Sequence, residues 1–268
     1  MALGSPRADR RTGDADGDRM TLVEHLRELR SRLVKALVAL AVGACIGFVL
    51  YDPVLDVLVE PYCDVKADQV DATEEAAGQG SAAGGCDLVV TDPLESFSVR
   101  IKLSTYIGLL IASPVVLWQI WRFITPGLYA REKRLAIPFV ASSVFLFALG
   151  AVTAWLTFPK TLQFFAAFGG DSLTLLYTPG KYLGLLTVMM LVFGLAFLFP
   201  IVLVFLQLAG VLSWRRLSSW RRYAIVVIFV VGAVITPSGD PITLIAMAVP
   251  MVLFYEISIL VGRFAIKR

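Results

Sequence analysis

Residues 135–158 read LAIPFVASSVFLFALGAVTAWLTF, an apolar run that contains no charged residue. A helix needs roughly 20 apolar residues to cross a bilayer, so this run is long enough to span one. Three similar segments are Leu33–Leu50, Leu103–Trp121 and Tyr182–Val211. Two more are Tyr223–Thr236, which falls short of that length, and Ile242–Gly262, which Pro250 and Glu256 interrupt. The sequence therefore predicts an all-α membrane protein with six transmembrane helices, the fifth and sixth being short.

The overall composition agrees with this prediction. Of the 268 residues, 57% are hydrophobic and 17% are charged, and the mean hydropathy is +0.77. Soluble domains carry about a quarter charged residues, so this chain has too few charges to cover an ordinary soluble surface. The net charge of +3 is small and scattered. We therefore expect membrane lipid around the chain and no nucleic-acid partner.

Basic residues predict the orientation of the helices. Nineteen of the 24 Lys and Arg residues fall within residues 7–35, 122–134, 215–222 and 263–268. The other five, which lie in the alternate connections, are Lys66, Arg100, Lys102, Lys160 and Lys181. Cytoplasmic connections of membrane proteins carry an excess of Lys and Arg. The pattern predicts a multi-pass protein of the cell (cytoplasmic) membrane with both termini in the cytoplasm.

Outside the predicted helices, two segments differ in composition from the rest. Residues 1–20 are rich in Arg, Asp and Gly and are expected to form a disordered cytoplasmic tail, before a single transmembrane domain over residues 21–268. The first outside loop, 51–98, is acidic and holds a flexible insertion over 63–86. Cys63 and Cys86 flank this insertion and could form a disulfide on an oxidising face, but their spacing alone does not establish the geometry.

The chain lacks the common signatures of enzymes. It has no P-loop, no pair of histidines spaced for a metal, and a single histidine, His25. We therefore predict no enzymatic activity, no cofactor and no metal. A small-solute transporter is the alternative, although the first four predicted helices contain no carboxylate of the kind that ion-coupled transporters place inside the membrane. A structural scaffold is a third class.

The ionisable residues gather instead at the cytoplasmic ends of the predicted helices. Glu28 is spaced to form an i,i+4 pair with Arg32, or to contribute to an acidic spot that binds a cationic ligand. Glu132 lies among Arg131, Lys133 and Arg134, and is most simply their partner. Glu256, near the end of the last predicted helix, is placed to reach the cytoplasmic interface, to pair with Arg263, or to contact a partner protein.

Several motifs occur in the order found in one known family. They are Glu24–Leu33 (EHLRELRSRL), Ser113-Pro114, Trp121–Tyr129 (WRFITPGLY), Glu132–Arg134 (EKR), Phe193–Phe197 (FGLAF), Pro200, Thr236-Pro237, and Pro250 with Phe254-Tyr255-Glu256. Together they resemble the TatC family, the multispanning core of the twin-arginine protein translocase. The resemblance runs from about Thr21 to Arg263.

This resemblance implies a function and a set of partners. It implies a receptor for twin-arginine signal peptides and a core subunit that exports folded proteins, driven by the proton-motive force. Implied partners are TatA- and TatB-type single-span proteins, signal peptides of folded cargo, and further copies of the chain. By position, the residues implied in signal-peptide binding are Glu28, Glu132, Arg30 and Phe123. Those implied in partner contact or in structure are Pro61, Thr236, Asp240 and Glu256.

One position departs from the family pattern. Many relatives carry a glutamate within the F-x-x-P motif of the fourth helix, whereas this chain reads Phe197-Leu198-Phe199-Pro200. A proton relay or a polar partner contact that depends on this acid is therefore in doubt for this chain. Gln207 lies further along the same predicted helix and is polar, but it is not equivalent to the acid.

Overall fold

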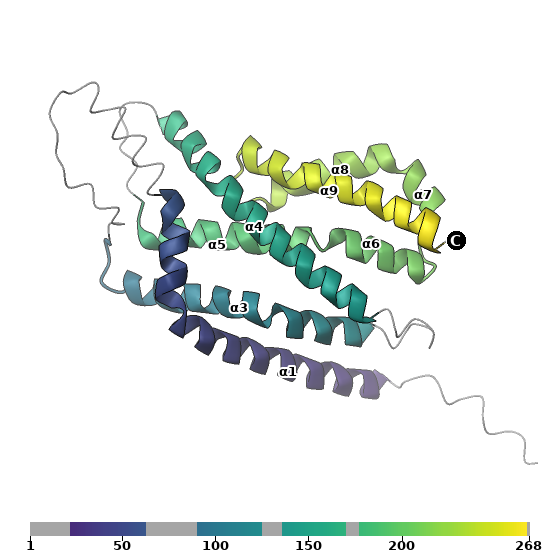
Figure 1. Ribbon diagram of the computed structural model, residues 1–268, viewed down its shortest axis with the longest axis horizontal. Coiled ribbons are helices and arrows are strands. Elements are labelled where there is room, and N and C mark those ends of the chain that lie inside the picture. The colour runs from purple at the N-terminus through teal and green to yellow at the C-terminus, as the bar shows by residue number, and fades with distance from the viewer. Residues whose placement is uncertain (1–21, 63–89, 125–135, 170–176, 267–268) are drawn as a thin grey trace, which may run out of the picture.

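The computed structural model describes residues 22–62, 90–124, 136–169 and 177–266 (Figure 1). Within these ranges every regular element is a helix, which confirms the prediction of an all-α protein. The helices are α1 (Leu22–Val49), α3 (Glu95–Ile124), α4 (Ala136–Gly169), α5 (Pro179–Ala196), α6 (Phe199–Leu208), α7 (Trp214–Ser219), α8 (Arg221–Ile235) and α9 (Pro241–Val261), followed by the π-helical turn η3 (Gly262–Ile266). The predicted tail 1–20 and the insertion 63–86 with Cys63 and Cys86 lie outside the described residues.

Five helical stretches of the described chain are long and apolar enough to cross a membrane. They are Leu26–Val49, Glu95–Phe123, Ile137–Phe168, Pro179–Leu208 and Pro241–Phe264. The predicted fifth helix corresponds to α8, which has 15 residues and is short as expected. The expectation of a short sixth helix is wrong, because α9 runs for 21 residues through Pro250 and Glu256. A proline within a membrane helix is tolerated where neighbouring groups accommodate the backbone.

Glycines bring α1 and α3 into close contact. A Cβ atom on Gly43 would lie 2.5 Å from the carbonyl oxygen of Gly108, and Cβ atoms on Gly47 and Gly108 would also overlap the facing backbone. Small residues four apart allow helices to approach this closely in membranes. The two helices run side by side in opposite directions (Figure 1). Glu28 precedes Gly43 by as many residues as Phe123 follows Gly108. Because the two helices run in opposite directions and touch at these glycines, Glu28 and Phe123 lie toward the same end of the molecule.

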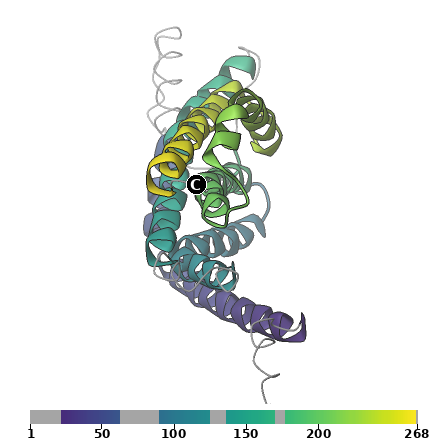
Figure 2. The same cartoon turned by 90° about the vertical axis from the view of Figure 1, so that its right-hand side faces the viewer.

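The helices begin and end at two opposite ends of the molecule. One end, which we call the rim, holds the N-terminal ends of α1 and α4, the C-terminal ends of α3, α6 and α9, and α7 (Figure 1). Figure 2 shows α1 at one edge of the molecule and α8 with α9 at the other. The core between them is built on fully buried side chains of α4, α5 and α9: Phe158, Leu186, Met189, Phe193 and Met247.

The end away from the rim is closed by the helical residues 51–62. The sequence predicts a loop here, which is wrong for these residues, because Leu58 and Tyr62 pack into the main core and are buried. The Tyr62 ring meets Tyr177 and Tyr182 edge-on, with centroids 6.1 and 5.5 Å away. The Tyr182 hydroxyl donates a hydrogen bond of 2.9 Å to the Leu58 carbonyl. Burial raises the pKa of Tyr62 and of Tyr177, so both phenols stay uncharged.

Candidate functional site

Glu28 lies on the first turns of α1 and forms the i,i+4 pair that its spacing allows. Arg32 donates from Nε to Glu28 Oε1 at 3.0 Å, and Arg32 Nη2 contacts the same oxygen. The second oxygen, Oε2, is buried and has no hydrogen-bond partner among the described residues. A carboxylate accepts hydrogen bonds on both oxygens, so half of the accepting capacity of Glu28 is unused.

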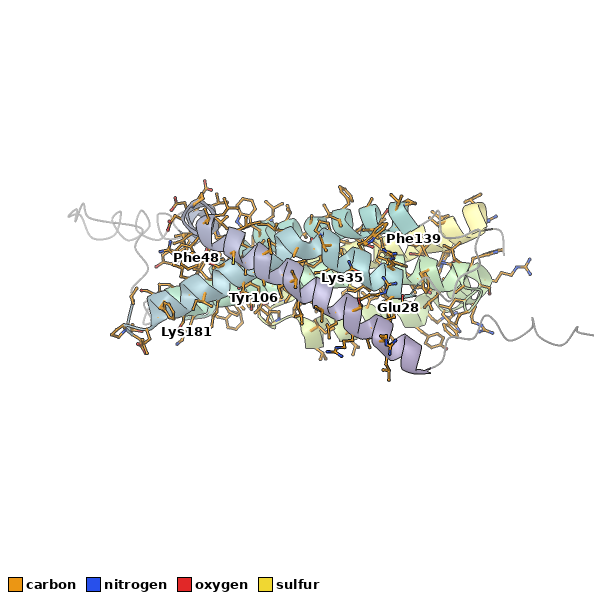
Figure 3. The ribbon with its side chains drawn as sticks, turned by 90° about the horizontal axis from the view of Figure 1, so that it is seen from below. Glu28, Lys35, Phe48, Tyr106, Phe139 and Lys181 are labelled. Carbon is orange, nitrogen blue, oxygen red and sulfur yellow. The ribbon has the colours of Figure 1, made fainter. Side chains whose placement is uncertain are left out.

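Arg30 and Phe123 occupy different positions on this surface. Arg30 is exposed on α1, and two residues along a helix turn it by about 200° from Glu28, so it faces another side. Phe123 is half-buried near the end of α3. Figure 3 shows Glu28 on α1 and Phe139 on α4 toward the same end of the molecule, with Phe48 and Lys181 toward the other. The structure therefore places Glu28, Arg30 and Phe123 at the rim.

A side-chain contact between α3 and α4 fixes the rim beside Phe123. Trp121 Nε1 donates to Ser143 Oγ at 3.0 Å, and Ser143 Oγ donates to the Phe139 carbonyl at 2.7 Å. The Trp121 ring packs against Phe139 and Phe205, with centroids 5.0 and 5.3 Å away. The sequence showed aromatic residues at this depth, but it gave no sign of a hydrogen bond between residues 22 positions apart.

Glu132 lies outside the described residues, in the connection between α3 and α4. Helix α3 ends at the rim and α4 begins there (Figure 1). The Trp121–Ser143 hydrogen bond ties these two helices together close to their ends. The described residues thus fix where the connection leaves α3 and where it enters α4.

Asp240 and Thr236 lie in the turn between α8 and α9, away from the rim. Asp240 is 2% exposed and caps α9, accepting hydrogen bonds from Thr243 N at 2.8 Å and from Thr243 Oγ1 at 2.7 Å. Gly239 has a positive φ of 63°, which permits the tight turn before the cap. Thr236 ends α8 with a buried hydroxyl that has no partner in the described chain. Pro61 is buried in the helical segment 51–62. The structure does not bring these three residues to Glu28.

Glu256 forms an ion pair between α9 and α8. Its Oε2 lies 2.9 Å from Arg221 Nη2. The expected alternative, a pair with Arg263, is wrong, because the Arg263 guanidinium lies over the Trp214 and Phe264 rings at 5.8 and 5.5 Å. The distances along the chain favoured Arg263, whereas the packing of α8 beside α9 brings Arg221 closer.

Leu198, at the family's glutamate position, lies between α5 and α6, where it is half-buried. The polar residue further along, Gln207, is 2% exposed and donates from Nε2 to the Ser258 carbonyl at 3.0 Å. It therefore joins α6 to α9. Across the described ranges, no three His, Cys, Asp or Glu side chains gather in a way that would hold a metal ion.

Comparison with known proteins gives a consistent result. The family model described as Sec-independent protein translocase protein (TatC) matches residues 24–250. The Sec-independent protein translocase protein TatC of Frankia casuarinae is 42% identical over 253 residues, covering 94% of this chain and 68% of that protein. The TatC protein of Aquifex aeolicus is 39% identical over 254 residues, covering 93% and 97%.

Solved structures agree with the sequence comparisons. A crystal structure of the twin arginine translocase receptor TatC, determined in the detergent DDM, superposes with a TM-score of 0.68 at 38% identity. The match covers 89% of this chain and 99% of the crystallised one. With five membrane-length helices in its described part, this multi-pass membrane protein belongs to the TatC family of Sec-independent protein translocase proteins.

Proposed function

We propose that this chain is the receptor for twin-arginine signal peptides and the core subunit of a translocase that exports folded proteins. Two carboxylates, Glu28 and Glu132, receive the paired arginines of the signal. A guanidinium group matches a carboxylate in a planar two-bond arrangement that a lysine ammonium does not reproduce. Arg30 and Phe123 shape the surrounding surface. No covalent chemistry is required, because recognition is a binding step.

The observation that carries this proposal is the half-used carboxylate of Glu28. Arg32 occupies Oε1, while Oε2 is covered and has no partner in the part of the chain that the structure describes. Because Oε2 is covered in the free protein, an incoming guanidinium must displace a neighbouring group, and Arg32 carries the matching charge. Binding is therefore an exchange of one arginine for another. An i,i+4 ion pair stabilises a helix by about 0.3–0.5 kcal/mol, so this exchange costs little.

The proposed topology has six membrane helices, with the rim and both termini in the cytoplasm. Ten described basic residues lie in segments that end at or near the rim: Arg27, Arg30, Arg32, Lys35, Arg122, Arg215, Arg216, Arg221, Arg222 and Arg263. This distribution agrees with the excess of basic residues on the cytoplasmic side of membrane proteins. The 15-residue α8 then makes the sixth crossing. Because α8 is shorter than the bilayer is thick, the lipid beside it becomes thinner.

TatA- and TatB-type single-span proteins are the proposed partners, together with further copies of this chain. Helix α8 offers them an apolar face on which Val226, Val230 and Val234 are exposed. Thr236 closes that helix with a hydroxyl that has no partner among the described residues, while Pro61, Asp240 and Glu256 support the structure or contact the partners. The proposed source of energy is the proton-motive force.

Photocrosslinking to a signal peptide tests the recognition step. A twin-arginine peptide bearing a photoreactive group is added to membranes that contain the full chain or its Glu28→Gln or Glu132→Gln variant. Removing one partner of a shielded charge pair costs at least about 2 kcal/mol, so affinity falls roughly thirty-fold in each variant. A twin-lysine peptide binds weakly to the unchanged protein.

Asp52→Asn provides the control. Asp52 is also paired with an arginine, Arg100 at 3.5 Å, but at the end away from the rim. This variant should bind the twin-arginine peptide as the unchanged chain does. Unchanged crosslinking in both glutamate variants would exclude the assigned role, and equal losses in all three would indicate a general effect of charge.

A further inference from the structure

Two arginines from different helical elements share one tryptophan at the rim. The Arg215 guanidinium on α7 lies 5.5 Å from the Trp214 ring centroid, and that of Arg263 in η3 lies 5.8 Å from it. We call these three residues the Trp214 bracket. The bracket lies on the side of α8 and α9, whereas Glu28 lies on α1 at the other edge of the molecule (Figure 1, Figure 2). It is thus separate from the proposed signal-peptide site.

Backbone packing holds the bracket together. A Cβ atom on Gly262 would lie 3.1 Å from Trp214 Cβ and would overlap Gln207 Oε1, so the backbone of residue 262 lies against both side chains. Gln207 in turn donates to the Ser258 carbonyl on the preceding turn. The residue that follows, Arg263, therefore leaves the backbone directly beside Trp214. The approach of the two arginines is built into the junction of α6, α7 and α9.

The bracket carries positive charge that the described chain does not neutralise. Arg221, close by on α8, pairs with Glu256 at 2.9 Å. In the described ranges, no carboxylate forms an ion pair with Arg215 or with Arg263, and both residues are exposed. A cation–π contact with an aromatic ring accepts no hydrogen bond from the five N–H donors of a guanidinium in the way a carboxylate would, so donors remain for another group. The bracket thus offers hydrogen-bond donors and charge to an anion.

Exposed apolar residues lie in or next to the two elements that carry this charge. Val211, Trp220 and Phe264 are 62%, 49% and 67% exposed, and all three lie in the same short elements as the bracket or next to them. Tryptophan with basic residues is typical of the membrane–water interface. An anion bound here would therefore have apolar protein surface directly beside it. A phospholipid supplies both parts, a phosphate for the arginines and acyl chains for the apolar side chains.

We propose that the Trp214 bracket binds the headgroup of an anionic phospholipid. Charge complementarity selects the anionic headgroup, and the neighbouring exposed side chains select a membrane lipid over a soluble anion. The phosphate accepts hydrogen bonds from the two guanidinium edges, while Trp214 keeps both arginines in position. The site ties the C-terminal end of α9 to the cytoplasmic leaflet.

Native mass spectrometry of the detergent-purified full chain tests this site. The chain is titrated with phosphatidylglycerol and with phosphatidylcholine of the same acyl chains, and the bound fraction of each is measured. We expect preferential binding of phosphatidylglycerol. In the Arg215→Gln/Arg263→Gln double variant the affinity of the chain for phosphatidylglycerol falls roughly five-fold for each arginine removed. Trp214→Leu weakens it in the same direction by releasing both side chains.

The matched control is the Arg216→Gln/Arg222→Gln double variant. It removes the same charge from exposed arginines of α7 and α8 that are not stacked on Trp214, and it should change the affinity less than two-fold. Equal losses in the two double variants, or equal binding of both lipids, would overturn the proposal. So would displacement of the lipid by equimolar inorganic phosphate, or by a poly-glutamate peptide, because the occupant would then be a soluble anion or an acidic polypeptide.

Discussion

Three carboxylates, two away from the rim and one at it, use their oxygens differently. Away from the rim, Glu95 accepts a hydrogen bond from Gly180 N at 2.9 Å on Oε1 and one from Thr91 N at 3.3 Å on Oε2. Asp240 likewise accepts one hydrogen bond on each oxygen, both from Thr243. At the rim, Glu28 directs a single oxygen to Arg32, and within the described ranges no donor reaches the other.

This difference separates carboxylates that satisfy both oxygens within the chain from Glu28, whose second oxygen has no donor among the described residues. Glu95 joins the start of α3 to the start of α5, and Asp240 starts α9, so each satisfies its acceptors within the chain. A buried acceptor without a partner costs about 1–3 kcal/mol, so its retention calls for an explanation. For Glu28 the explanation proposed here is the arginine of a signal peptide.

Gly43→Ala should have the largest effect, because it separates the helix that carries Glu28 from the rest of the chain. The new Cβ would lie 2.5 Å from the Gly108 carbonyl oxygen, so α1 must move. Overpacking of this kind costs about 1–3 kcal/mol, measured as thermal unfolding in detergent, and signal-peptide binding should fall as well. Gly184→Ala in α5 is the matched control, because its Cβ would meet nothing within 4 Å. Equal stability of the two variants would show that α1 and α3 are not in close contact.

Asp240→Ala should lower stability while leaving recognition intact. The substitution removes the cap of α9 and leaves a buried Thr243 N–H without its acceptor. Loss of such a cap costs about 0.5–2 kcal/mol. Asp240→Asn, which keeps a capping oxygen, should lose less. A fall in signal-peptide crosslinking without a fall in unfolding temperature would contradict the structural role and remove the contrast with Glu28.

Tyr182→Phe probes the closure of the end away from the rim. It deletes the hydroxyl that donates to the Leu58 carbonyl and keeps the ring in contact with Tyr62. We expect a loss of about 1 kcal/mol in the free energy of unfolding. Tyr106→Phe serves as the comparison, since the Tyr106 hydroxyl makes no hydrogen bond within the described residues. If both variants have the same free energy of unfolding as the unchanged chain, the helical segment 51–62 is not held by this hydrogen bond.

Much of this architecture follows from hydropathy. Residues 136–158 of the uncharged run lie within α4, and most of each apolar segment before and after it lies in α1, α3 or the α5–α6 pair. The short α8 was also predictable, because its apolar segment ends at the Pro-Gly turn. These features depend on residues close together in the chain, and for this reason a single sequence reveals them.

Contacts between helices were harder to predict. The Trp121–Ser143 hydrogen bond and the Arg221–Glu256 ion pair join residues far apart in sequence, so they depend on how the helices pack. The helical segment 51–62 was missed because its acids suggested a solvated loop, while Leu58 and Tyr62 were the residues that decided its structure. At the candidate site, spacing revealed the Glu28–Arg32 pair, but not that one oxygen of Glu28 would remain unpartnered.

Arg32→Ala should have the smallest effect and gives the sharpest test of the exchange. Removing the resident guanidinium costs about 0.3–0.5 kcal/mol in stability, the value of an i,i+4 pair. It also removes the competitor for Glu28, so the affinity for a twin-arginine peptide should rise about two-fold, because 0.4 kcal/mol corresponds to that factor. Arg30→Ala, which removes the same charge from another side of α1, should not raise the affinity. A loss of affinity in Arg32→Ala would mean that Arg32 itself contacts the signal, and the unpartnered oxygen would then need another explanation.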